Sequence, residues 1–258
     1  MFGIDISRWQ GNYNIAKAVK AHKIEFLILK IGGGDNGLYK DRKFDDYYAQ
    51  CKQLGIPVGC YFFGNANTME EAKKEANYWL SLMKGKQFDF PVFYDVESKD
   101  MLGAGKIMLT NIVNEVCQTV ENAGYWVGIY SSLSYFNTKM NDAALSKYTH
   151  WVAQWDAKKP SKLKSGNDTH IWQYKVAVLG DREIDHDISY INYSPLIKSK
   201  GLNGYKTPNI KSDLAIAKEV LAGIWGNGTR RKQALKENGY DYNVIQKIVN
   251  RLIKEGKK

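Results

Sequence analysis

The chain has 258 residues, 44% of them hydrophobic and 25% charged, which is ordinary for a folded globular protein. Its formal net charge of +10 suits an anionic partner, and no apolar run reaches the roughly 18–20 residues that span a membrane. The opening residues, MFGIDISRWQ, lack a basic segment followed by an apolar one, so we predict no signal peptide and no membrane insertion. We therefore expect synthesis in the cytoplasm, and any role outside the cell would need another route of release.

Eight short apolar runs have the composition of buried strands. In chain order, the first five are FGIDI (2–6), FLILKI (26–31), PVGCYFF (57–63), DFPVFYDV (89–96) and WVGIY (126–130). The last three are HWVAQW (150–155), HIWQY (170–174) and EIDHDI (183–188). Continuous apolar strands of this kind are typical of a parallel sheet that helices cover.

Segments with helical spacing separate the first five runs. One example has apolar residues at Ala72, Ala76, Trp79, Leu80 and Met83. The helical signal fades after the fifth run, and eight strands are the number that closes a barrel. We therefore predict an α/β fold, an irregular TIM-like (β/α)5(β)3 barrel. A doubly wound open sheet is the alternative, but Gly32–Gly34 lacks the GxGxxG pattern of a phosphate loop.

The last quarter of the chain has a different composition. From about Ile197 the sequence is rich in Lys, Gly, Asn and Pro, and three helical segments follow at 213–222, 229–238 and 241–254. We predict a barrel over 1–197, a linker over 198–210 and an all-α three-helix module over 211–258. The module has 11 Lys and Arg against 5 Asp and Glu, which is +6 of the total charge. Nucleic acid and an anionic cell wall are both candidate partners.

Acidic residues lie at the ends of several predicted strands, where barrel enzymes carry their catalytic groups. Asp5 ends the first run, Asp95 and Glu97 the fourth, and Asp185 and Asp187 the last. The first and last strands of a closed barrel are neighbours, so Asp5 and Asp187 can approach each other. Aromatic and amide side chains accompany them, after the first run and on the third, fifth, sixth and seventh: Trp9, Tyr61, Tyr130, Trp151, Gln154 and Gln173. Acids with aromatic walls suit a sugar chain, because rings stack on pyranose faces while carboxylates act on the glycosidic bond.

The Asp95-x-Glu97 pair stands out by its position more than by its pattern. A second D-x-E, at Asp181 and Glu183, follows a Leu-Gly turn, and we interpret it as an exposed loop. Asp95 and Glu97 are two residues apart on a strand and point to the same side, although a structural pair at a strand end is the alternative. The histidines are interpreted as structural, and no metal site is predicted because the chain has no CxxC and no His/Cys cluster. We expect the cysteines to be buried thiols: Cys51, Cys60 and Cys117.

Five segments together resemble glycoside hydrolase family 25 lysozymes over residues 1–195: GIDISRWQG, PVFYDVE, WVAQW, IWQY and DHDIS. The resemblance implies hydrolysis of the β-1,4 bond from N-acetylmuramic acid to N-acetylglucosamine in peptidoglycan, without a cofactor. It implies Glu97 as general acid, Asp95 as its acidic partner, and Asp5 and Asp187 as flanking aspartates. The family usually has a GNVDLN-like text where this chain has DHDIS, so Asp185 is an alternative to Asp187. The alignment of D-I-S with D-L-N favours Asp187.

The tail resembles the short wall-binding repeat of some phage lysozymes, through AGIWGNGTRRKQAL (222–235) and ENGYDYNVIQKIVN (237–250). Such repeats bind a disaccharide-peptide of peptidoglycan, and the resemblance makes Trp225, Gly226, Arg231 and Tyr240 candidate contacts. Trp225 and Tyr240 are alternatively core residues of a small bundle. A single copy binds weakly, so a homo-oligomer or a contribution from the barrel would strengthen attachment.

Taken together, the resemblances imply a phage endolysin that lyses its host after release through a holin. A bacterial autolysin and a non-catalytic wall-binding protein are the alternatives. A chitinase-like barrel fits less well because FPVFYDVE lacks the longer DxxDxDxE run. A nucleic-acid role for the tail is disfavoured because its aromatic residues do not interleave with its basic ones. Two routes remain open: Asp95 orients the N-acetyl group for internal attack with retention, or Asp95 or Asp187 activates water with inversion.

Overall fold

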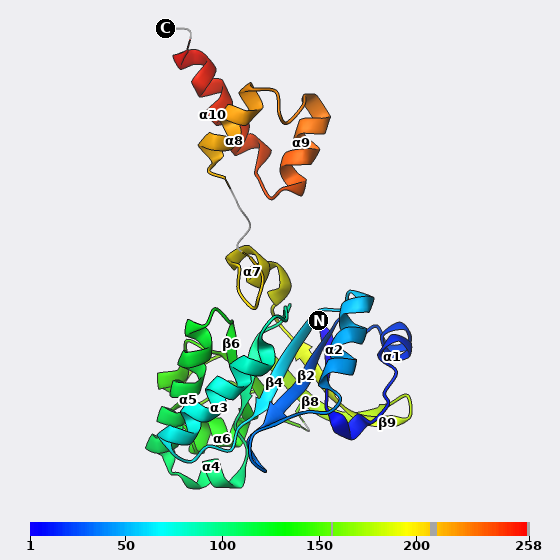
Figure 1. The fold of residues 1–258 in the computed structure, drawn as a ribbon, viewed down its shortest axis with the longest axis vertical. Helices are drawn as coiled ribbons and strands as arrows, with labels where there is room; N and C mark the ends of the chain where they lie inside the picture. Colours follow the sequence, from blue (N-terminus) through cyan, green and yellow to red (C-terminus); the bar gives the residue numbers. More distant parts are fainter. Residues whose placement is uncertain (156, 207–210, 257–258) are drawn as a thin grey trace. The chain divides into compact units, whose positions relative to one another are not determined.

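The computed structural model describes residues 1–155, 157–206 and 211–256 (Figure 1). The chain divides into two compact units, Met1–Lys206 and Thr207–Lys258. The first is built from strands and helices and the second from helices alone, and each has an apolar core of its own.

Eight strands close the barrel of the first unit. They are β1 (Phe2–Ile6), β2 (Phe26–Gly33), β4 (Val58–Phe63), β5 (Val92–Asp95), β6 (Val127–Ser132), β7 (Thr149–Ala153), β8 (Ile171–Leu179) and β9 (Arg182–Ser189). The ring closes because β1 pairs with β2 on one side and with β9 on the other. Each predicted apolar run is a strand with somewhat shifted ends, and the predicted barrel is confirmed. A short strand that we did not predict, β3 (Tyr39–Lys40), pairs with the end of β2.

The last strand runs against the other seven. Neighbours from β1–β2 round to β7–β8 are parallel, whereas β8–β9 and β9–β1 are antiparallel. Only Gly180 and Asp181 connect β8 to β9, and Gly180 has φ 75°, which glycine adopts without strain. Because β9 is reversed, its beginning lies at the edge of the barrel where the other strands end. We call this edge the C-terminal rim and the opposite edge the N-terminal rim.

Helices cover the barrel between its first five strands (Figure 1): α1 (Ile15–His22), α2 (Phe44–Leu54), α3 (Met69–Met83), α4 (Lys99–Gly103) and α5 (Lys106–Asn122). As predicted, the helices shorten after the fifth barrel strand, where α6 (Leu133–Thr138) and a 3-10 turn, η2 (Asp142–Leu145), follow. Apolar side chains fill the layer between strands and helices. A second cluster, which includes Trp151, contains Phe26 and Phe90 with ring centroids 4.4 Å apart.

The segment after β9 packs against the N-terminal rim. It contains α7 (Tyr193–Lys200), and residues 198–206, which we predicted to be linker, belong to the first unit. Asn203 explains this difference, because it is fully buried and bonds to the barrel. Its amide nitrogen donates to the Phe90 carbonyl (2.8 Å), and its amide oxygen accepts from the Trp126 N–H (2.6 Å). The rest of the predicted linker, 207–210, lies outside the described residues.

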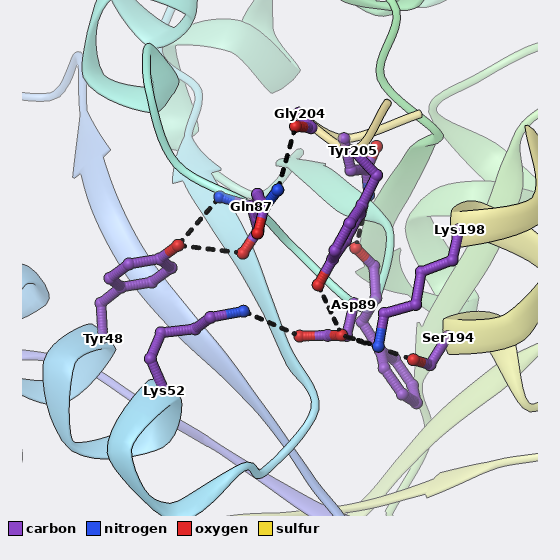
Figure 2. A network of polar contacts seen from close by, with 10 residues as sticks. Tyr48, Lys52, Gln87, Asp89, Ser194, Lys198, Gly204 and Tyr205 are labelled. Carbon is purple, nitrogen blue, oxygen red and sulfur yellow. Dashed lines mark hydrogen bonds and ion pairs between the residues drawn. The ribbon is translucent and has the colours of Figure 1, made fainter. Parts of the chain in front are cut away.

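Asp89, just before β5, ties the same segment to the barrel (Figure 2). Its Oδ1 accepts from the Tyr205 hydroxyl (2.7 Å) and pairs with Lys198 (2.8 Å), while Lys52 of α2 lies 3.4 Å from Oδ2. Burial by itself would raise the pKa of Asp89. The hydrogen bonds from Lys198 and Tyr205, with the charges of both lysines, outweigh burial and hold that pKa below its usual value.

The second unit is a bundle of three helices: α8 (Asp213–Leu221), α9 (Gly228–Glu237) and α10 (Tyr242–Glu255). Asp241 caps α10, since its Oδ1 accepts from the N–H groups of Asn243 (2.7 Å) and Val244 (3.1 Å). The core of this three-helix bundle consists mainly of Ile216, Ala217, Val220, Leu235, Tyr240, Ile245 and Val249. Across the described ranges, no helix has the length and apolarity needed to cross a membrane. The three cysteines are buried free thiols, as predicted.

Candidate active site

The C-terminal rim encloses a cavity of about 240 Å³ with an acidic lining. Four carboxyl side chains line it: Asp5, Asp95, Glu97 and Asp185. The remaining wall is aromatic apart from one amide, and it consists of Tyr61, Tyr130, Trp151, Trp155 and Gln173. The structure therefore brings three of the four predicted catalytic acids together with four of the six predicted substrate-binding residues.

The strands fix the depth of each acid in this cavity. Asp5 is the second-last residue of β1 and lies opposite Asp185 of β9 in the sheet register. Asp95 is the last residue of β5 and is only 3% exposed, whereas Glu97 is exposed at the mouth. Between them, the Val96 carbonyl accepts from the Ser131 hydroxyl (2.6 Å), and the Val96 N–H donates to the Tyr130 carbonyl (2.9 Å). These bonds extend the sheet beyond β5 and hold the backbone that carries Glu97.

Asp187, which the sequence favoured over Asp185, does not line the cavity. It is fully buried, and its Oδ1 accepts from the Trp151 indole N–H at 2.8 Å. The reason is the direction of β9, because the residues nearer its beginning are the ones that reach the C-terminal rim. Asp185 therefore faces the cavity, and Asp187 lies two residues deeper, opposite Gly3 of β1.

Burial raises the pKa of every carboxyl in this cluster. Repulsion adds to this effect: Asp185 and Asp187 raise the pKa of Asp5, and Glu97 raises that of Asp95. The pKa of Asp185 rises to about 6. The cluster therefore holds protons at pH values where isolated carboxyl groups have lost them, which is a property of catalytic acids.

A buried cation moderates this effect. Lys30 of β2 is 9% exposed, and its Nζ lies 4.4 Å from the ring centroid of Phe63 and 5.8 Å from that of Tyr61. Its charge lowers the pKa of both Asp95 and Glu97, against the larger effect of burial. Lys30 was not among the predicted site residues. The polar residue inside the apolar run FLILKI was the available signal.

Hydrogen bonds join the aromatic wall to the acids. The Gln173 amide donates to Asp5 Oδ2 (2.9 Å) and accepts from the Tyr130 hydroxyl (2.9 Å). Tyr130 packs on Trp151 with ring centroids 4.5 Å apart. One oxygen of Asp95, Oδ1, is buried and finds no hydrogen-bond partner among the described residues. An unsatisfied buried acceptor beside a cavity is available to a ligand donor.

Two predicted substrate-binding residues lie elsewhere. The Gln154 side chain bonds to Ser161, with its amide nitrogen 2.9 Å from the hydroxyl and its oxygen accepting from the Ser161 N–H at 2.8 Å. Trp9 lies in a 3-10 turn after β1, η1 (Arg8–Gln10), and is 76% exposed outside the cavity wall. Conversely, Trp155 was missed. It lines the cavity while 53% exposed, and the second tryptophan of WVAQW was its signal in the sequence.

The histidine His150 and the second D-x-E pair lie outside the acidic cavity. His150 is buried and pairs with Asp142 at 2.7 Å, away from the cavity. Asp181 and Glu183 of the second D-x-E are exposed in the β8–β9 hairpin. In the described part of the chain, no group of three or more His, Cys, Asp or Glu side chains is arranged to hold a metal ion.

The candidate contacts of the second unit divide into two kinds. Tyr240 is 9% exposed and packs edge-on against Trp225 at 5.8 Å, so both contribute to the bundle core. Arg231 is nearer the surface, and its Nε donates to the Gly226 carbonyl at 2.9 Å. A further guanidinium nitrogen donates to Asn227 at 3.0 Å. Arg231 and Gly226 therefore form one local structure, in which the guanidinium fixes the loop before α9.

Comparison with known proteins identifies both units. Residues 4–178 match the family Glycosyl hydrolases family 25, and residues 215–253 match the CW_7 repeat. The chain belongs to glycosyl hydrolase family 25. It is 26% identical over 161 residues, 62% of its own length, to the autolytic lysozyme of Clostridium acetobutylicum. Over 238 residues, 87% of its length, it is 26% identical to the lysozyme of Streptococcus phage Cp-7.

A solved structure agrees with the fold. The bacterial lysozyme from Streptomyces coelicolor superposes with a TM-score of 0.67 at 23% identity, over 80% of this chain and 98% of that one. The match covers 47% of the Clostridium protein and 65% of the phage Cp-7 protein. The chain thus spans about half to two thirds of the length of these curated relatives.

Proposed function

We propose that this chain is an N-acetylmuramidase, which hydrolyses the β-1,4 bond from N-acetylmuramic acid to N-acetylglucosamine in bacterial peptidoglycan. The observation that carries the proposal is the cavity at the C-terminal rim, where four carboxyl groups meet an aromatic wall. Membership of glycosyl hydrolase family 25 and the likeness to proteins named lysozyme support the choice of substrate.

Glu97 is the general acid in this proposal. It lies at the mouth of the cavity, where a glycosidic oxygen can reach it, and burial together with the charge of Asp185 raises its pKa. A raised pKa lets the carboxyl keep its proton to a higher pH than an isolated glutamic acid does, and this proton is the one it donates to the leaving oxygen.

Asp95 is the partner that orients the substrate. Its buried Oδ1 is an acceptor without a partner in the described structure, and we infer that it accepts the N–H of the substrate's acetamido group. The acetamido oxygen then attacks the anomeric carbon while Glu97 protonates the leaving oxygen, and water later opens the ring intermediate with Glu97 as base. This route predicts retention of configuration, and inversion in the product first released, followed by NMR, would contradict it.

Asp5, Asp185 and Asp187 support this pair without donating the proton. Asp185 lines the cavity and is suited to hold a sugar hydroxyl. Asp5 is fixed by Gln173, and Asp187 by Trp151. We propose that Asp187 acts from beneath the cavity, by accepting from the Trp151 indole N–H and so holding the ring that forms part of the cavity wall.

The decisive experiment is mass spectrometry of the fragments released from purified peptidoglycan. Muramic acid at the new reducing end is the expected result, and glucosamine at that position would contradict the proposal. The matched variant is Glu97→Gln, which keeps the shape of the side chain and removes its proton, and we expect roughly 10³-fold slower release. Near-normal release by a folded Glu97→Gln protein would remove Glu97 from its assigned role.

For the second unit we propose attachment to the cell wall, with Arg231 and Gly226 as ligand contacts. The CW_7 match and the excess of basic residues support this. We further propose that the protein is a phage endolysin, because the match to the phage Cp-7 lysozyme extends over 238 residues. The named autolytic relative keeps a bacterial autolysin as the second candidate. Lysis triggered only during phage growth, as opposed to wall turnover in uninfected cells, separates the two.

A further inference from the structure

A second cavity, of about 340 Å³, lies at the N-terminal rim of the barrel, opposite the acidic one. Its wall includes the residue before β6, the first residue of β7, the residue before β8 and part of α7. The polar and aromatic residues that matter here are Trp126, Lys147, Thr149, His170, Tyr193 and Lys200. The proposed muramidase reaction uses none of them.

One lining residue of this cavity has a buried hydroxyl whose hydrogen bonding is incomplete. Tyr193, the first residue of α7, is fully buried, and its hydroxyl interacts with the Thr149 side chain but makes no hydrogen bond of good geometry within the described residues. Its ring is held in place by packing on Trp126 at 5.6 Å and on Phe90 at 5.5 Å. A buried hydroxyl without a partner is costly, and a bound ligand that accepts its proton would remove this cost.

His170 adds a second hydrogen-bond donor, because a backbone hydrogen bond fixes the tautomer of its neutral imidazole. Its Nδ1 accepts from the His150 backbone N–H at 3.0 Å, so a neutral His170 carries its proton on Nε2. Burial, followed by the proximity of His150, lowers the pKa of His170 and favours this neutral form. The imidazole therefore offers the cavity an N–H group rather than an acceptor.

The charge of the cavity wall is positive. Lys147 and Lys200 both line it, and its one acidic residue, Glu121, lies 2.8 Å from Lys147, so these two charges cancel and Lys200 supplies the net positive charge. No ion pair within the described ranges includes Lys200, whose ammonium lies 4.8 Å from the Trp126 ring centroid. Two ammonium groups, an imidazole N–H and a hydroxyl thus line one space. This donor set fits an anion with several acceptor oxygens.

The rest of the wall is suited to a short carbon skeleton. Trp126 uses its indole N–H internally, on the Thr149 hydroxyl at 3.0 Å, which leaves its ring as an apolar surface. Ile191 and Leu202 extend this surface. A polyol or sugar can place its C–H groups there while its anionic group meets the lysines.

We propose that this cavity binds the phosphate ester of a small polyol, such as glycerol phosphate, either free or as the repeating unit of an anionic polymer. The phosphate oxygens accept from Lys200, Tyr193 and His170, and the carbon chain lies against Trp126. The volume lies at the lower end of the range for small-molecule sites. The barrel would then contact an anionic polyol phosphate with the end opposite its acidic cavity.

Calorimetric titration of the full chain tests the proposal with three probes: glycerol 3-phosphate, a poly(glycerol phosphate) chain and inorganic phosphate. We expect saturable binding of at least one of the first two, weakened by salt, and weaker binding of inorganic phosphate. Binding of the monomer points to a free ester, and binding of the polymer alone points to a polymeric one. Equal binding of inorganic phosphate would overturn the polyol assignment, and no binding of any probe would overturn the site.

Two variants locate the binding. Tyr193→Phe removes a buried oxygen without a well-formed hydrogen bond, and Lys200→Gln removes an exposed charge. We therefore expect an equal or higher thermal midpoint for the first variant, an unchanged one for the second, and unchanged wall lysis for both. Each should weaken binding about tenfold, as expected for loss of a hydrogen bond to a charged group. The matched control is Lys73→Gln, an exposed lysine of α3 outside the cavity. Unchanged affinity in both test variants, or an equal loss in the control, would contradict the assignment.

Discussion

Two aspartates flank the same strand and have opposite surroundings. Asp89 lies before β5 at the N-terminal rim, where two lysines, a tyrosine and a serine surround it (Figure 2). Asp95 ends β5 at the C-terminal rim, with an unpartnered oxygen in the described structure and an acidic neighbour, Glu97. The pKa of Asp89 is lowered and that of Asp95 is raised.

The difference shows how one short segment, DFPVFYD, serves stability at one end and chemistry at the other. A carboxylate that is fully paired stabilises the fold while it is ionised. A buried carboxyl without partners destabilises the fold when it ionises, and it keeps its hydrogen-bonding capacity for a substrate. Substitutions at both aspartates, at Trp155 of the cavity wall and at Lys30, whose charge acts on Asp95 and Glu97, test this contrast.

The largest expected effect is at Asp95. Asp95→Asn keeps the size of the side chain but removes its charge, and we expect the rate of peptidoglycan hydrolysis to fall about 100-fold or more. Because the folded pKa of Asp95 is raised, its ionisation destabilises the fold as pH rises through that value, so the variant should unfold at an equal or higher temperature at pH 7. Kinetics and thermal melts check both parts. A drop in activity accompanied by a lower melting temperature would mean that Asp95 is structural.

Asp89→Asn should give the reverse pattern. We expect a loss of about 1–2 kcal/mol in the free energy of unfolding, with kcat unchanged. The folded pKa of Asp89 is lowered, so its stabilisation is present above the unfolded pKa and is lost as pH falls through the folded value. Urea titrations at neutral and acidic pH measure this, and the gap between the variant and the parent should narrow in acid. A constant gap would contradict the ion-pair explanation.

Trp155→Ala should have a smaller effect, confined to substrate binding. Loss of an exposed aromatic wall is expected to raise KM about fivefold, or about 1 kcal/mol, with little change in kcat. Trp9→Ala is the matched control, because Trp9 is an exposed tryptophan outside the cavity wall. Equal changes in KM for Trp155→Ala and Trp9→Ala would contradict a role of Trp155 in substrate binding at the cavity.

The smallest change in rate, but a clear change in pH dependence, is expected at Lys30. Its charge lowers the pKa of Asp95 and Glu97, so Lys30→Met should raise both and move the alkaline decline of activity to higher pH. Asp35 also raises the pKa of Asp95, and Asp185 that of Glu97, and both remain in the variant. Lys30→Arg keeps the charge and should keep the profile. Identical pH profiles for the Met and Arg variants would exclude an electrostatic role for Lys30.

Much of the barrel could be predicted from the sequence, because buried strands and amphipathic helices leave periodic apolar patterns. The predicted strands FGIDI and FLILKI correspond to β1 and to most of β2, and the helical spacing around Trp79 corresponds to α3. Strand direction leaves no such pattern. We placed the end of the last run at the mouth, as for a parallel strand, and favoured Asp187 over Asp185 there because D-I-S aligns with D-L-N. The two-residue Gly180–Asp181 connection contained the missing information, because so short a turn joins only antiparallel strands.

The candidate site was partly predictable for a similar reason. Acids at strand ends follow from the barrel, and Asp5, Asp95 and Glu97 meet as the spacing indicated. The orientation of side chains beyond strand ends depends on loop structure, so Gln154 and Trp9 were misplaced and Trp155 was missed. Segments held by polar contacts were also hard to recognise. Residues 198–206 have a linker's composition, yet one buried amide, that of Asn203, fixes them.

Asn203 also determines where this barrel can be separated from the second unit. Its side chain and backbone form hydrogen bonds with backbone groups of Trp126, Phe90, Phe88 and Gly124, which would lose these partners without it. Cutting the chain at residue 197 would expose those groups, whereas the first unit ends at Lys206. A fusion of this barrel to another binding module therefore needs to include Asn203. The boundary of such a fusion is best placed after Lys206, where the first unit ends.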